Sequence, residues 1–93
     1  MEPFRFTIAL PRDADSLPLL GALCDHVARF VGLTDRAARQ RREELEQVVR
    51  ERLNAEAEGP IEVAFERKAG DPTVIVEVTN VTQRFRWEAR RAG

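Results

Sequence analysis

The side chains that could support nucleophilic or metal chemistry are few in this sequence, and their spacing does not suit it. Cys24 is the one cysteine and His26 the one histidine. On a helix these two residues point in different directions, so the imidazole is not placed to deprotonate the thiol. One histidine without a second His or Cys ligand also does not build a zinc site. We expect Cys24 to be a packed thiol and His26 to lie at the core edge or the surface.

Acidic residues are the second group of candidates, because they gather in one stretch: Glu43, Glu44, Glu46 and Glu51. Paired carboxylates can perform general acid–base chemistry. Here arginines alternate with them in similar number, which favours a solvated helix face. The sequence has no Ser-His-Asp set and no glycine-rich phosphate loop. We therefore expect no catalytic residue, no metal site and no cofactor, and the sequence favours a protein that is not an enzyme.

The segment 83–91 alternates arginine with aromatic residues. As a free arm it could bind nucleic acid or an acidic protein. As an edge strand it would point its aromatic residues inward and its arginines outward. We favour the edge strand, because the rest of the chain offers no basic surface to extend a nucleic-acid site. Trp and Arg are enriched at protein interfaces. The candidate interaction residues are therefore the arginines and aromatics of this segment: Arg84, Phe85, Arg86, Trp87, Arg90 and Arg91.

The composition is that of one small globular domain spanning residues 1–93. The chain is 43% hydrophobic and 33% charged, with a formal net charge of −1. That net charge gives no overall attraction to nucleic acid or to an acidic membrane. The first residues, Met1-Glu2-Pro3, lack the basic and apolar regions of a signal peptide, and no apolar run is long enough to span a bilayer. We expect a cytoplasmic protein that does not bind membranes.

Hydrophobic periodicity predicts two helices and at least three strands. Alternating apolar residues indicate strands over 4–10, 60–67 and 73–79, and apolar residues at helical spacing indicate helices over 15–31 and 35–56. Asp15 or Ser16 can cap the first helix, and Gly32 is the natural residue just after its end.

The helix over 35–56 is the central element of the predicted order. Thr34 is placed to cap it. Asp35–Arg39 and Glu46–Arg50 form potential ion pairs four residues apart, with the acid first. Such pairs contribute a few tenths of a kcal/mol each, so burial of the apolar stripe must stabilise the helix. That stripe consists of Ala38, Leu45, Val48, Val49 and Leu53.

A fourth strand over 81–88 follows if Thr79-Asn80 forms a tight turn. Val81 would then face Val78, Gln83 would face Val76, and Phe85 would face Val74. Alternatively, the third strand continues and the last residues form an arm. The residues expected to be buried together are Ile8, Leu23, Val27, Val49, Leu53, Val63 and Val76.

The expected fold class is α+β, with the order β-α-α-β-β and a possible final β. Each strand has one apolar face and each helix one apolar stripe. The economical packing is a two-layer sandwich, with two helices on one face of a small, mostly antiparallel sheet. The open face of the sheet would carry Arg5, Thr7, Glu62, Glu66 and Glu77.

A resemblance to a known family rests on three stretches. The strand ending in Leu-Pro, the helix SLPLLGALCDHVARFVGL and the charged helix opening TDRAARQ resemble anti-sigma-factor serine kinases. These kinases belong to the histidine-kinase-like (GHKL) ATPase superfamily. The stretch GPIEVAFERKAGDPTVIVEV resembles the hairpin that follows the family's central helix. The resemblance covers roughly residues 4 to 80 and rests on element order and hydrophobic phase.

The nucleotide motifs of that family are missing. Its central helix carries a Glu and, four residues on, an Asn that holds magnesium; here Gln47 and Glu51 take those positions. Its third strand is followed by Asp-x-Gly-x-Gly, whereas residues 78–83 here contain neither Asp nor Gly. The resemblance thus implies a degenerate relative without an ATP site, and we expect no Mg-ATP binding.

Three functions follow from these observations. The first is a non-catalytic regulatory module whose partner is a sigma factor, an anti-sigma antagonist or a second copy of itself as a homodimer. The second is an ATP-binding or other enzymatic domain completed by a partner chain. The third is a small nucleic-acid binder that uses the arginine-rich tail. We favour the first.

Overall fold

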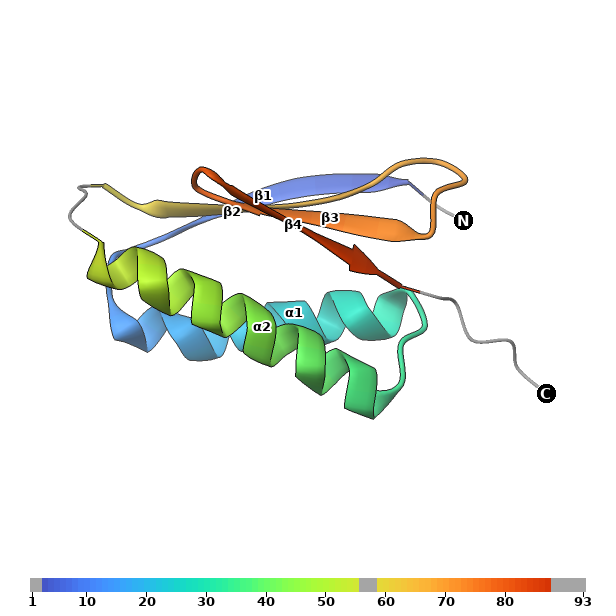
Figure 1. The fold of residues 1–93 in the computed structure, drawn as a ribbon, viewed down its shortest axis with the longest axis horizontal. Helices are drawn as coiled ribbons and strands as arrows, with labels where there is room; N and C mark the ends of the chain where they lie inside the picture. Colours follow the sequence, from blue (N-terminus) through green and yellow to red (C-terminus); the bar gives the residue numbers. More distant parts are fainter. Residues whose placement is uncertain (1–2, 56–58, 88–93) are drawn as a thin grey trace.

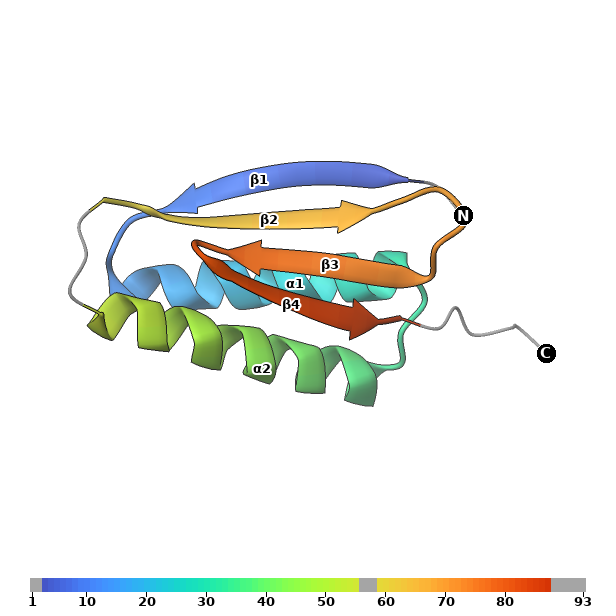
Figure 2. The ribbon, with the colours of Figure 1, turned by 45° about the horizontal axis from the view of Figure 1, so that its top comes forward.

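The computed structural model describes residues 3–55 and 59–87. Its element order is β1 (Phe4–Leu10), a 3₁₀ turn η1 (Ala14–Ser16), α1 (Leu17–Phe30), α2 (Asp35–Asn54), β2 (Ile61–Arg67), β3 (Thr73–Val78) and β4 (Val81–Arg86). The strands form one sheet in the order β1-β2-β3-β4, with every neighbouring pair antiparallel. Both helices cover the same face of this sheet (Figures 1 and 2). The predicted α+β two-layer fold is confirmed.

The first strand has the predicted bounds, and the other elements differ from the predicted ones by one or two residues at one end or both. The first helix opens as a 3₁₀ turn before α1 begins at Leu17, and it stops at Phe30. The strands expected over 60–67, 73–79 and 81–88 run over Ile61–Arg67, Thr73–Val78 and Val81–Arg86. Positions 56 and 88, the predicted ends of the second helix and the last strand, lie outside the described residues. Among the described residues, no helix is both long and apolar enough to cross a membrane.

The core lies between the sheet and the helices, and residues from every strand and both helices contribute to it. Of the residues expected to be buried together, Val27, Val49, Val63 and Val76 are buried. Ile8, Leu23 and Leu53 are only half-buried, although they pack against the core. The largest fully buried side chains are Trp87, Phe65, Leu10, Leu20, Leu45 and Ile61.

The tight turn at Thr79-Asn80 and the register of β4 are confirmed. Val78 pairs with Val81, Val76 with Gln83 and Val74 with Phe85. Asn80 has a positive φ of 69°. Asparagine tolerates this left-handed conformation better than most residues, which is why Thr-Asn can close the hairpin.

Two of the three predicted helix ends have the expected chemistry. The Thr34 hydroxyl accepts a hydrogen bond from the Ala37 N–H at 3.2 Å. Gly32 has a φ of 92°, its N–H donates to the Arg29 carbonyl, and the Leu33 N–H donates to the Ala28 carbonyl. This is the Schellman arrangement that ends helices at glycine.

The side-chain cap at the start of the first helix is a wrong prediction. Ser16 holds the cap position of α1, but its backbone is helical and its side chain makes no capping bond. The preceding 3₁₀ turn has already brought the chain into a helical conformation. The Ser16 hydroxyl donates instead to the Pro11 carbonyl at 3.3 Å, which fixes the turn between β1 and α1.

Candidate functional site

The aromatic residues that sequence analysis placed in an interaction segment lie in the interior. Phe85 is 2% exposed and Trp87 is fully buried, so neither can meet a partner in this fold. Arg84 and Arg86 are exposed on β4, as the edge-strand interpretation expects. Arg90 and Arg91 lie outside the described residues.

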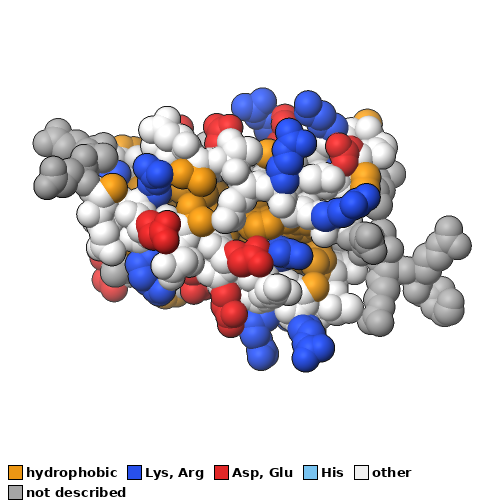
Figure 3. All heavy atoms as spheres, viewed as in Figure 1, with side chains coloured by type: hydrophobic (Ala, Val, Ile, Leu, Met, Phe, Trp, Pro, Cys, Tyr) orange, Lys and Arg blue, Asp and Glu red, His pale blue; other side chains and the backbone are white. Residues whose placement is uncertain are grey.

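The side of the molecule where β4 meets α2 carries charged groups close to its apolar atoms. The guanidinium of Arg41 lies 5.6 Å from the centre of the Phe85 ring, and its Nη1 donates to both oxygens of Glu44 at 3.0 Å. Side chains of both charge signs surround the hydrophobic band visible on this side (Figure 3). Three buried polar atoms of the described residues have no hydrogen-bond partner: Arg41 Nε, Gln83 Oε1 and Trp87 Nε1.

The two α2 residues that replace the magnesium-binding pair of the kinases face solvent. Gln47 and Glu51 are both exposed, and the Gln47 side-chain amide donates to Glu51 at 3.4 Å. The stretch where the glycine motif would lie forms the β3–β4 turn and the start of β4. Among the described residues, no group of three or more His, Cys, Asp or Glu side chains is placed to hold a metal ion.

The cysteine and the histidine are separated by the packing of α1. Cys24 is fully buried, and that burial raises the pKa of its thiol from 9.0 to about 12. A thiol with so high a pKa is a poor nucleophile at neutral pH. His26 is exposed on another side of α1, so the two groups do not form a catalytic pair.

An apolar surface runs along the free edge of β1 and the adjoining side of α1. We call it the β1–α1 flank, and its residues are Phe4, Phe6, Ile8, Leu19, Leu23, His26 and Phe30. Phe30 is 65% exposed and Leu19 is 64% exposed, which makes them the exposed large hydrophobic residues of the described chain. A hollow of about 220 Å³ lies here, lined by Phe4, Phe6, His26, Val27 and Phe30.

Aromatic rings connect this surface to the core. The Phe30 ring meets Phe4 edge-on, with ring centres 6.1 Å apart, and Phe4 lies 6.0 Å from Phe6. Phe6 in turn stacks on the buried Phe65 at 5.1 Å. The exposed Phe30 is therefore linked to the core through a continuous series of ring contacts.

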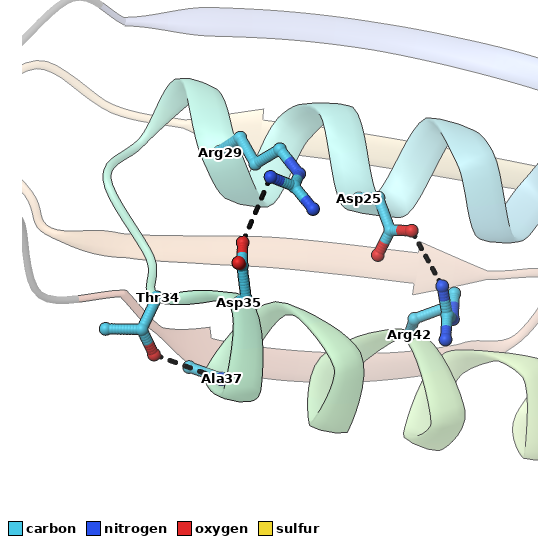
Figure 4. A network of polar contacts seen from close by, with 6 residues as sticks. All are labelled: Asp25, Arg29, Thr34, Asp35, Ala37 and Arg42. Atoms are coloured by element: carbon cyan, nitrogen blue, oxygen red, sulfur yellow. Dashed lines mark hydrogen bonds and ion pairs between the residues drawn. The ribbon is translucent and has the colours of Figure 1, made fainter.

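The charged residues of β1 and α1 all point away from the flank. Asp25 binds Arg42 of α2 at 2.7 Å, and Arg29 binds Asp35 at 3.0 Å across the helix–helix connection (Figure 4). Arg5 lies on the outer face of the sheet and contacts Glu66 at 3.5 Å. The flank is left without an Asp, Glu, Lys or Arg side chain, which distinguishes it from the β4–α2 side.

These ion pairs correct the prediction for α2. Asp35 pairs with Arg29 of α1 and not with Arg39, and Glu46 approaches Arg42 at 3.8 Å and not Arg50. Asp35 thus pairs with the neighbouring helix α1. Glu46 keeps a partner within α2, but that partner is Arg42, which also binds Asp25 of α1 at 2.7 Å.

Comparisons with protein-family models, with curated proteins and with solved structures found no match to this chain. The resemblance to anti-sigma-factor kinases stays a prediction.

Sequence analysis missed the flank although a signal for it was present. Leu19, Leu23, His26 and Phe30 follow one another at steps of four, three and four residues, beside the core stripe of α1. A helix that packs on one sheet face and one neighbouring helix needs a narrower apolar arc. The surplus width marks a side of α1 that no described part of this chain covers.

Proposed function

We propose that this chain is a non-catalytic protein–protein interaction module whose partner docks on the β1–α1 flank. The observation that carries the proposal is Phe30, an aromatic side chain 65% exposed beside described β1 and α1 residues that include no Asp, Glu, Lys or Arg on this side. Contiguous exposed apolar surface on a soluble protein marks an interaction site. The open edge of β1 adds a second means of binding, because a partner strand can hydrogen-bond to it.

The resemblance to anti-sigma-factor kinases supports a regulatory role in bacterial signalling. It offers a sigma factor, an anti-sigma antagonist or a second copy of the chain as the partner. Gln47 and Glu51 stand where the kinases carry the magnesium-binding Glu and Asn, and both side chains face solvent, which supports a role without nucleotide chemistry.

Nucleic acid is a weaker candidate partner. The exposed arginines of β4, Arg84 and Arg86, share the outer sheet face with Glu62 and Glu77. A nucleic-acid footprint is a continuous basic patch. Alternation of both signs across this face gives no such patch.

The proposal is tested with a tagged chain incubated in extract of its native host, with bound proteins quantified by mass spectrometry. Three baits are compared: the natural chain, Phe30→Lys and Ala22→Lys. Ala22 is exposed on the same helix but lies outside the flank, so it is a control matched in charge and element. We expect a partner that binds the natural chain and Ala22→Lys and is lost from Phe30→Lys. Identical sets of proteins on all three baits would show that the flank binds nothing.

A further inference from the structure

We infer that the partner on the β1–α1 flank is a second copy of this chain, joined through antiparallel pairing of the two β1 strands. The inference rests on the proposed function, since it names the occupant of the same surface. The result would be a symmetric dimer with one continuous eight-stranded sheet and the two α1 helices side by side beneath its centre.

The sequence of β1 is compatible with pairing to itself. A two-fold axis at Thr7, the middle of the strand, pairs all seven residues of Phe4–Leu10 with those of the second copy. Arg5 then lies opposite Ala9, and Phe6 lies opposite Ile8. No like charges face each other, and the apolar faces of both sheets stay on the helix side.

The other edge of the sheet is protected against such pairing. β4 exposes Arg84 and Arg86, and charged side chains on an edge strand disfavour the addition of another strand. Arg5 is the one charged residue of β1, and Glu66 of the neighbouring strand contacts it. Of the two edges, β1 is therefore the one open to a second copy.

The flank side of α1 fits the same symmetry. Its residues Leu19, Leu23, His26 and Phe30 have the four-three-four spacing of a helix–helix seam. In an antiparallel pair of α1 helices, Leu19 would meet Phe30 of the second copy and Leu23 would meet His26. Each exposed apolar residue would thereby gain an apolar neighbour.

The spacing of the layers permits both contacts at once. Strands lie about 4.8 Å apart, so the four strands of one chain take up about 19 Å of a continuous sheet. Packed helices lie about 8–10 Å apart, so two helices take up about 16–20 Å beneath it. Both helices of one chain lie beneath its four strands (Figure 2). A sheet that continues across the two-fold axis with the same spacing brings the two α1 helices to about the 8–10 Å of packed helices.

The same two-fold axis can also pass through the middle of the β1 pair and the middle of the α1 pair. Phe4 lies three residues from Thr7, which is about 10 Å along a strand. Phe30 lies between five and six residues from the middle of the seam, which is about 8 Å along a helix. The ring centres of Phe4 and Phe30 lie 6.1 Å apart, so these two residues lie at the same end of β1 and α1. The middle of β1 and the middle of the α1 seam therefore lie at about the same distance from that end.

Charge favours a copy over a charged partner. The seven flank residues include no Asp, Glu, Lys or Arg in either copy, so the packing of one flank on the other buries no charged side chain of these residues. The net charge of −1 gives little repulsion between two chains. A partner with an acidic or basic docking surface would find no opposite charge on the flank.

The first test is the mass of the pure chain by sedimentation equilibrium over about 1 µM to 1 mM. We expect the mass to rise from 10.6 kDa towards twice that value. Phe30→Lys should raise the dimer dissociation constant at least about tenfold, because it places a charge against the apolar Leu19 of the second copy in the helix seam. Ala22→Lys should leave it unchanged. A mass of 10.6 kDa at every concentration would overturn the inference.

The second test is the register. In a Cys24→Ala background, which removes the natural thiol, Thr7→Cys should cross-link two chains on oxidation or with a short bismaleimide. The control Ala9→Cys should not, because a shift of two residues on each strand separates those thiols by about 14 Å. Cross-linking at Ala9→Cys alone would overturn the inference by placing the axis elsewhere.

Failure here differs from failure of the proposed function. A monomeric chain that still captures a Phe30-dependent protein from extract would mean that the flank binds a different protein. A chain without any Phe30-dependent partner, including itself, would overturn both.

Discussion

Leu45→Ala tests the packing of α2 against the sheet. Leu45 is fully buried, one turn before the buried Val49 on the face of α2 that meets the sheet. Truncating a fully enclosed leucine removes its burial and leaves a cavity, at a cost of about 2–5 kcal/mol. A domain of this size has a total stability of about 5–14 kcal/mol. The loss should lower the melting temperature by about 4–8 °C per kcal/mol.

Substitutions of two less buried leucines provide a scale for the loss of stability expected of Leu45→Ala. Leu53 is half-buried, so Leu53→Ala should cost less than Leu45→Ala. Leu19 is 64% exposed, and Leu19→Ala in a monomer should stay within about 0.5 kcal/mol of the natural chain. The order of losses should therefore follow the order of burial.

The assay is urea unfolding followed by the fluorescence of Trp87, which is the one tryptophan and is fully buried. Protein should be kept below the dimer dissociation constant, because dimerisation adds stability through mass action. A loss below about 0.5 kcal/mol for Leu45→Ala, or an equal loss for Leu19→Ala, would refute this description of the core.

Three other predictions follow from single contacts. Burial raises the pKa of the Cys24 thiol from 9.0 to about 12, so stability is complete below pH 9.0 and falls as pH rises towards 12; urea midpoints measured across this range should decline less in Cys24→Ala. Arg12 donates to the carbonyls of Arg52 at 2.7 Å and Gly59 at 2.8 Å, so Arg12→Ala should cost about 1–3 kcal/mol in the same unfolding assay. Titration of Mg-ATP into the chain should give no saturable NMR shifts near Glu51. A sub-millimolar dissociation constant would contradict the hypothesis that the chain has no ATP site.

The fold could be predicted because its signals are local and agree with one another. Alternation in β1, β2 and β3 set the faces of the sheet, and the same faces are found in the structure. The register of β4 followed from one turn, because a two-residue loop leaves only one pairing of Val78 with Val81. The ends of elements were less certain, since fraying and 3₁₀ turns shift them by one or two residues.

The side-chain partners could not be predicted in the same way. Asp35 has an arginine four residues ahead of it on its own helix, yet it pairs with Arg29 across the connection. That choice depends on how closely α1 and α2 approach, which spacing along one helix does not contain. Likewise, Arg67 occupies an inward position of β2 and is 5% exposed, while its Nε donates to the Asp71 carbonyl at 3.3 Å.

The burial of two predicted interaction residues could not be foreseen for a related reason. Arginine and aromatic residues in 83–91 resembled an interface by composition, but strand alternation buries Phe85 and Trp87. Exposure of Phe30 depends on what covers α1, and no described element lies there. Residue type alone does not distinguish an aromatic side chain that is buried in the core from one that is exposed on the surface.

The way β4 completes the sheet connects these observations. By turning back at Asn80, the chain brings Phe85 and Trp87 into the buried core, where their ring centres lie 5.8 Å apart. Arg41 then lies over Phe85, and Arg84 with Arg86 protects the edge. β1 receives none of these features: its inner face stays half-buried and its edge is open. The exposed apolar surface of the described residues therefore lies on the side of β1 and α1, which is where we propose that a partner docks.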